Sequence, residues 1–185
     1  SLNLSVNLDA SHLQNPGFVG WLREELATHP RYEPGQLIIE VLETSSLEDF
    51  EQVRTVISEC NALGVDLSLD DFGTGYASLT YVRNLPTAEI KVDASFVRGC
   101  LEDPDDVAIV DGVVALGTAF QRRIVAEGVE TDAQLEFLRA QGCDELQGFL
   151  ISRPLDAASI EPLLHADHRV AGARPSHVPT PLEPA

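Results

Sequence analysis

Short apolar runs alternate with longer segments of helical periodicity along this chain, as far as about residue 164. Runs rich in Val, Ile and Leu, such as QLIIEV, are typical of strands that are buried on both faces. We expect strands at 2–8, 36–41, 65–71, 88–93, 122–127 and 145–148. Segments whose apolar residues recur every three or four positions indicate helices. We expect these at about 17–28, 47–63, 76–84, 105–120, from 131 onward, and at 156–164.

Local signals support the expected helix ends. Gly64 and Gly142 follow two helical segments at the position where a left-handed residue commonly ends a helix. Thr131, followed three residues later by Gln134, has the spacing of a capping box. Each of the six strands is followed by a helix, so the pattern predicts six βα units.

Repeated βα units imply parallel strands joined by right-handed crossovers, either in a barrel or in an open doubly wound sheet. A (β/α) barrel usually has eight units, so six units fall two short. An open sheet has no such deficit. However, neither GxGxxG nor GxxxxGK[ST] occurs, so a nucleotide-binding open sheet has no motif support.

Composition narrows the class of protein. Thirty acidic residues against twelve Lys and Arg give a formal charge of −18, which argues against binding to DNA or RNA duplexes and to anionic membranes. No run approaches the ~20 apolar residues of a membrane helix, so we expect a cytoplasmic domain, whatever anchor a parent chain carries upstream. Three cysteines without a CxxC pair indicate free thiols in a reducing compartment.

The two ends of the chain differ from the rest. Ser1 lies inside a strand-like run and the chain has no Met, so we expect it to be part of a longer chain. Residues 171–185 contain four prolines and little apolar pattern. We therefore expect one domain over residues 1–165 and a disordered Pro-rich tail over residues 166–185.

Polar residues stand at or near the end of every expected strand. They are Asn7, Glu40, Asp70 with Asp71, Lys91, Glu127 and Gln147. Each alone has an ordinary explanation, because strand ends are often polar turn positions. In a parallel barrel, however, the carboxyl ends of all strands open onto one face, where catalytic groups gather. We therefore expect these side chains to converge.

The expected cluster has the chemistry of a divalent-metal site. Asn7, Glu40, Asp70 and Asp71 offer only oxygen ligands, which favour Mg²⁺, Mn²⁺ or Ca²⁺ over Zn²⁺. Adjacent carboxylates can serve two ions that clamp the attacking and leaving oxygens of a phosphoryl displacement. Bound cations would also offset the repulsion between an acidic chain and an anionic substrate. The pattern predicts a metal-dependent site that cleaves a phosphodiester.

Five residues complete the candidate set. Gly73 and Gly75 would let the backbone turn sharply beside a ligand, although a flexible loop is the alternative interpretation. Lys91 and Glu127 supply a cation and a proton acceptor. Glu130 would brace the loop or the base, and a solvated loop carboxylate is the alternative.

Six motifs, in order, resemble those of the EAL-domain family of cyclic-di-GMP phosphodiesterases. They are SVNL at 5–8, EVLE at 40–43, DDFGTGYASL at 70–79, IKVDASFV at 90–97, IVAEGVET at 124–131 and LQGFLISRPL at 146–155. The resemblance implies an α/β fold, a TIM-like (β/α) barrel with one antiparallel strand. It also implies two Mg²⁺ or Mn²⁺ ions and hydrolysis of cyclic-di-GMP to linear pGpG.

The resemblance also implies roles for individual residues. Asn7, Glu40 and Asp70 would bind one ion, and Asp70 and Asp71 would reach the second. Lys91 would orient the attacking water or the scissile phosphate, and Glu127 would act as general base or as a partner of the metal site.

Two more roles concern the surroundings of the site. Glu130 would hold the loop that follows the Asp strand, and Gln147 would contact the metal-bound water or the substrate. In this family that loop couples the site to dimerisation, so a homodimer is implied. Parent chains in the family often carry GGDEF or sensory domains upstream.

One departure from the family pattern matters for activity. The Glu-Ala-Leu motif, whose Glu is a metal ligand in the family, is absent from these 185 residues. We expect the missing part to include the first two strands, which accounts for six of eight βα units. The fragment alone is then expected to hydrolyse little substrate. A degenerate EAL module that binds the dinucleotide or a partner protein without cleavage is the alternative, and an unrelated metal-dependent barrel lyase has no motif support.

Overall fold

Six parallel strands form one curved sheet in the order β1-β2-β3-β4-β5-β6. The computed structural model describes residues 2–42, 50–74 and 79–164. The strands are β1 (Leu4–Asn7), β2 (Leu37–Leu42), β3 (Val65–Phe72), β4 (Glu89–Val92), β5 (Arg123–Ala126) and β6 (Glu145–Leu146). Each pairs in parallel with the next one along the chain. This half-barrel confirms the expected partial TIM-like fold, and the antiparallel strand that the resemblance implies is not among the described strands.

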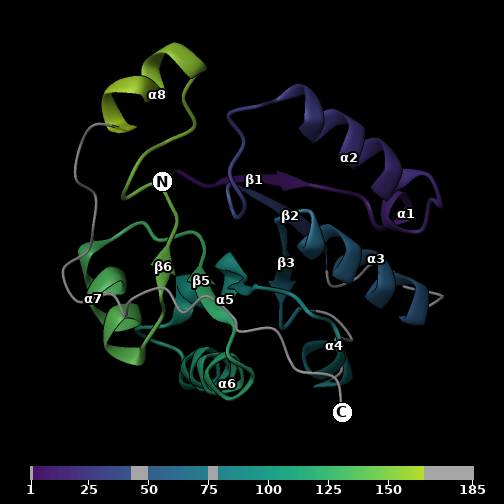
Figure 1. Cartoon of the computed structure of the whole chain (residues 1–185). Helices are drawn as coiled ribbons and strands as arrows, with labels where there is room; N and C mark the ends of the chain where they lie inside the picture. The colour runs from purple at the N-terminus through teal and green to yellow at the C-terminus, as the bar shows by residue number, and fades with distance from the viewer. Residues whose placement is uncertain (1, 43–49, 75–78, 165–185) are drawn as a thin grey trace.

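Eight helices are described in all. They are α1 (Ala10–Leu13), α2 (Phe18–Thr28), α3 (Phe50–Ala62), α4 (Leu79–Asn84), α5 (Ala94–Gly99), α6 (Pro104–Phe120), α7 (Asp132–Gln141) and α8 (Ala157–Leu164). Helices α2, α3, α4, α6 and α7 follow one another around the outside of the sheet (Figure 1). The expected starts of α3 and α4 lie outside the described residues. Helices α1 and α5 were not predicted, because four and six residues are too few to show helical periodicity. No described helix combines the length and apolar character needed to cross a membrane.

The two faces of the sheet have different chemistry. Ile39, Leu67 and Ile90 belong to the apolar core that the strands share with the helices on the convex face. Side chains alternate along a strand, so Glu40 and Lys91, next to Ile39 and Ile90, lie on the concave face. Both are buried, with 7% and 3% of their surface exposed. The fold thus places a charged layer inside the half-barrel.

The sheet has two free edges within the described residues. There β1 pairs only with β2, and β6 pairs only with β5. All four residues of β1 are exposed, and Leu4 and Val6 expose 62% and 45% of their surface. The strands therefore do not close into a full barrel in this part of the chain.

Candidate functional site

The carboxyl ends of the parallel strands bring the predicted polar residues to one end of the half-barrel. Asn7 is the last residue of β1 and is paired in register with Glu40 of β2. Lys91 lies in β4, and Glu127 follows β5 directly. The Glu127 N–H donates to the carbonyl of Val92, which extends the pairing of β4 and β5 by one residue.

Lys91 joins three of these strands through ion pairs. Its Nζ lies 2.9 Å from Glu40 Oε1, 3.2 Å from Asp70 Oδ1 and 2.5 Å from Glu127 Oε1. Burial alone would lower the pKa of Lys91, but hydrogen bonds to Glu127 and Glu40 outweigh it and raise the pKa above its ordinary value. Lys91 is therefore a fixed positive charge. Burial raises the pKa of Glu127, and Lys91 opposes that rise.

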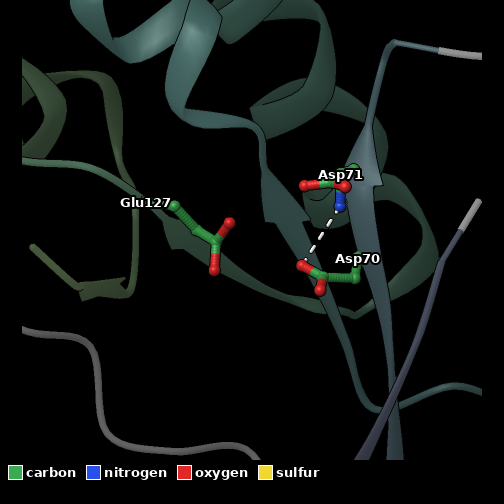
Figure 2. Close-up of side chains that lie close together, drawn as sticks. All are labelled: Asp70, Asp71 and Glu127. Carbon is green, nitrogen blue, oxygen red and sulfur yellow. Dashed lines mark hydrogen bonds between the residues drawn. The ribbon is translucent and has the colours of Figure 1, made fainter. Parts of the chain in front are cut away.

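A β-bulge brings two neighbouring carboxylates to the same side of β3. The β3–β4 register passes from Leu69–Ile90 to Phe72–Val92, so Asp70 and Asp71 together oppose one residue of β4. Asp71 has a left-handed backbone with φ 52°, and its N–H donates to Asp70 Oδ1 at 3.1 Å. In a regular strand these side chains would point to opposite faces. Figure 2 shows both of them near Glu127 instead.

The three acidic side chains form a cluster with the dimensions of a metal site. One carboxylate oxygen from each of Asp70, Asp71 and Glu127 lies within 4.8 Å of the other two. Oxygen donors of this kind fit Mg²⁺ or Mn²⁺. Glu127, predicted as the base or as a partner of the metal site, is thus close enough to the Asp pair for either role.

Asp93 lies beside this cluster and was not among the residues predicted from the sequence. It follows the last residue of β4, caps α5, and shares a hydrogen bond with Asp71. Burial and the charge of Asp70 raise the pKa of Asp71. Burial opposes ionisation of Asp93, but hydrogen bonds from Ser95 outweigh it and lower the pKa of Asp93. The available signal was its place at a strand end, two residues after Lys91.

An open pocket of about 430 Å³ lies beside the cluster. Three residues predicted to bind one ion line it together: Asn7, Glu40 and Asp70. Asn7 is exposed, whereas Glu40 and Asp70 are buried. The pocket therefore joins the buried carboxylates to solvent at the β1 edge.

The remaining predicted residues lie at the rim. Gln147 follows β6 and is exposed, and its carbonyl accepts a hydrogen bond from Val129 N–H at 3.0 Å. Glu130 is exposed, and its N–H donates to Gln134 Oε1 at 2.9 Å. Gly73 has φ 100° and turns the chain just after β3. Gly75 and the rest of the loop that Glu130 is predicted to hold, 75–78, lie outside the described residues.

The known proteins that this chain resembles belong to one family. The model of the EAL domain matches residues 1–154. The bifunctional diguanylate cyclase/cyclic di-GMP phosphodiesterase MucR of Pseudomonas aeruginosa is 45% identical over 158 residues, which are 85% of this chain and 23% of MucR. The chain thus spans about a quarter of that relative.

Solved structures show the same likeness. The MucR phosphodiesterase in complex with c-di-GMP superposes with a TM-score of 0.79 at 45% identity, covering 85% of this chain and 64% of that one. The EAL domain of Mycobacterium smegmatis DcpA has a TM-score of 0.83 at 35% identity, covering 88% and 72%. Klebsiella pneumoniae BlrP1, solved with manganese and cyclic-di-GMP, has a TM-score of 0.74 at 38% identity, covering 82% and 39%.

Proposed function

This chain belongs to the EAL domain family, whose model matches residues 1–154, and from that premise we propose that its site hydrolyses cyclic-di-GMP to linear pGpG. The observation that carries the proposal is the convergence of Asp70, Asp71 and Glu127 within 4.8 Å. The substrate is supported by the complexes of MucR and BlrP1 with c-di-GMP.

Two Mg²⁺ or Mn²⁺ ions fit the donor set of this site. The carboxylates lie close together, and the hydrogen bond between the carboxyl groups of Asp71 and Asp93 brings two acidic groups into contact that a cation would stabilise. We assign Asn7, Glu40 and Asp70 to one ion, and Asp70, Asp71 and Asp93 to the second. When bound, the ions would lower the pKa of a water molecule and would stabilise negative charge on the phosphate.

Side chains of the chain itself hold the site together and accept a proton. Lys91 fixes Glu40, Asp70 and Glu127 in one array through its three ion pairs, and its charge offsets part of theirs. As the water oxygen bonds to phosphorus, Glu127 accepts the proton that the water loses. The phosphorus–oxygen bond that closes the ring breaks, and the leaving ribose oxygen takes up a proton from solvent. Gln147, at the rim, would contact the metal-bound water or the substrate. Glu130, also at the rim, would hold the loop after β3.

The setting of the site is part of the proposal. We infer that it operates in a homodimer, within a longer chain that carries a GGDEF or sensory domain. The name of MucR, a bifunctional diguanylate cyclase and phosphodiesterase of which this chain spans 23%, supports the second point.

The test is the substitution Glu127→Gln, made in the full-length parent of this chain. It should abolish formation of pGpG, followed by chromatography with Mg²⁺ present, and leave cyclic-di-GMP binding within about threefold by calorimetry, because the amide keeps the shape but not the basicity of the carboxylate. Glu136→Gln, at an exposed carboxylate of α7, is the matched control and should hydrolyse normally. Undiminished pGpG production by Glu127→Gln would rule out the assigned base.

The open β1 edge favours a second function for the chain on its own. Asn7 is exposed there, and the pocket it shares with Glu40 and Asp70 is open to solvent. Such a half-barrel would bind the dinucleotide without hydrolysing it. Binding of cyclic-di-GMP with little Mg²⁺-dependent turnover would support this function, and turnover comparable to that of MucR would contradict it.

A further inference from the structure

The acidic cluster is assembled from two separate segments. Asp70 and Asp71 belong to the turn at the end of β3, and Glu127 belongs to the loop that follows β5. The short helix α5 touches both segments, through side chains that the proposed chemistry does not use. The distance between the two halves of the cluster therefore depends on how these segments pack on α5.

Phe96 of α5 packs against the aspartate turn. Gly73 has φ +100°, and a Cβ there would lie 2.9 Å from Phe96 Cε2. A real Cβ would not be tolerated at this distance, so the Phe96 ring lies directly against the backbone of Gly73. Thr74 ties the turn together, because its N–H and its hydroxyl both donate to the carbonyl of Asp71, at 3.3 and 2.9 Å. A shift of the Phe96 ring would therefore displace the turn and, with it, Asp71.

Ala94 of α5 packs against the glutamate loop. Gly128, the residue after Glu127, has φ +68°, and a Cβ there would lie 2.6 Å from the Cβ of Ala94. Gln134 links α5 to the same loop. Its Nε2 donates to the carbonyl of Val97 in α5 at 3.2 Å, while its Oε1 accepts the N–H of Glu130 at 2.9 Å.

The position of α5 itself is fixed. The carboxylate of Asp93 accepts hydrogen bonds from the N–H of Ser95, at 2.8 Å, and from its hydroxyl. On its other side α5 packs on α6, and Val97 and Cys100 are fully buried. A short helix that is capped at its start and anchored by a buried residue is a rigid spacer.

We propose that Ala94 and Phe96 are positioning residues that set the separation of the Asp70–Asp71 pair from Glu127, and thereby the affinity of the site for divalent ions. The inference rests on the proposed two-ion function and adds residues that touch neither ion nor substrate. A larger side chain at 94 would push the Glu127 loop outward, and a smaller one at 96 would release the aspartate turn.

The experiment measures Mn²⁺ binding to the 185-residue chain by calorimetry, with the metal alone and no substrate. Ala94→Val and Phe96→Leu should each weaken Mn²⁺ binding by about tenfold or more, as changes to the supports of metal ligands commonly do. The matched control is Phe120→Leu, another half-buried phenylalanine, at the last position of α6 and far from the strand carboxyl ends. It should lower thermal stability as much as Phe96→Leu and leave Mn²⁺ affinity unchanged.

Variants of Ala94 test the same inference without changing Phe96. If Phe96→Leu fails to fold, Ala94→Ser and Ala94→Val form a size series, in which affinity should fall as the side chain grows. Unchanged Mn²⁺ affinity in the folded variants would overturn the inference while leaving the proposed function intact. An equal loss in Phe120→Leu would also overturn it, because general loosening would then explain the effect. A wild-type chain that binds no Mn²⁺ would remove the proposed function and this inference together.

Discussion

Lys91 is the only lysine in the chain, and it is buried beneath three carboxylates. Only 4% of its side chain is exposed. Arg54, by contrast, makes an exposed pair with Glu51 on α3. Exposed pairs contribute little to stability, whereas loss of one partner from a buried pair leaves a charge without compensation. Loss of the cation should therefore cost more stability at Lys91 than at Arg54.

Lys91→Met should destabilise the chain by about 3–5 kcal/mol in the absence of metal, because Glu40, Asp70 and Glu127 lose their shared cation. Mn²⁺ should recover part of the loss, since it binds the same carboxylates in the folded state. Urea denaturation with and without Mn²⁺ measures both effects. Arg54→Met is the control and should change stability by less than about 1 kcal/mol. A similar loss in both variants would contradict the buried role of Lys91.

The three cysteine thiols should be unreactive in the folded chain. Burial, helped by Glu59, raises the pKa of Cys60 to about 11, and burial, helped by Asp144, raises that of Cys143 to about 12. The thiolate is the reactive form, so a raised pKa lowers the reactive fraction at any pH below it. An aromatic disulfide reagent at pH 8 should label all three thiols in urea and react far more slowly in the native state. The native rate should rise with pH, and fast labelling at pH 8 would contradict this expectation.

At the scale of elements, a residue that caps the start of α7 also contacts a helix far away in the sequence. Thr131 and Gln134 form the predicted capping box, in which Thr131 Oγ1 accepts the Gln134 N–H at 3.2 Å. Gln134 also donates to Val97 of α5. Its spacing from Thr131 was visible in the sequence, but its bond to a helix 37 residues earlier was not.

Gln134→Ala should therefore cost more stability than Thr131→Ala. The threonine variant loses one cap, about 1 kcal/mol. The glutamine variant loses the cap and the buried bond to α5, about 2 kcal/mol in all. Urea denaturation of the two variants gives the comparison. Equal losses would show that the bond to α5 contributes nothing.

At the scale of the whole molecule, the open half-barrel has an exposed apolar edge. Leu4 and Val6 lie on the face of β1 whose partners in register, Leu37 and Ile39, face the helices. An edge strand with exposed apolar side chains is a template for pairing with another chain. The 185-residue chain should therefore associate as its concentration rises.

Leu4→Lys with Val6→Lys should suppress this association, because charged side chains on an edge strand oppose pairing between chains. Sedimentation velocity over a concentration series measures it. Thr55→Lys with Ser58→Lys, at two exposed positions of α3, adds the same charge away from the edge and is the control. If both double variants associate less, net charge rather than the β1 edge is responsible.

The sequence by itself determined the six βα units, the parallel sheet and the polar residues at the strand ends. These features follow from local periodicity and from the fact that parallel strands share one carboxyl end. The position of Lys91 near a strand end marked it as a cation beside these residues, but its three ion pairs were not predicted.

Only the tertiary structure decided how these residues meet. The bulge that turns Asp70 and Asp71 to the same side depends on the register of β3 against β4 and on the left-handed backbone of Asp71. The contact of Asp93 with Asp71 and the packing of α5 on Gly73 and Gly128 depend on segments more than 20 residues apart. Register and such close approaches arise when distant segments pack, so no local pattern in the chain encodes them.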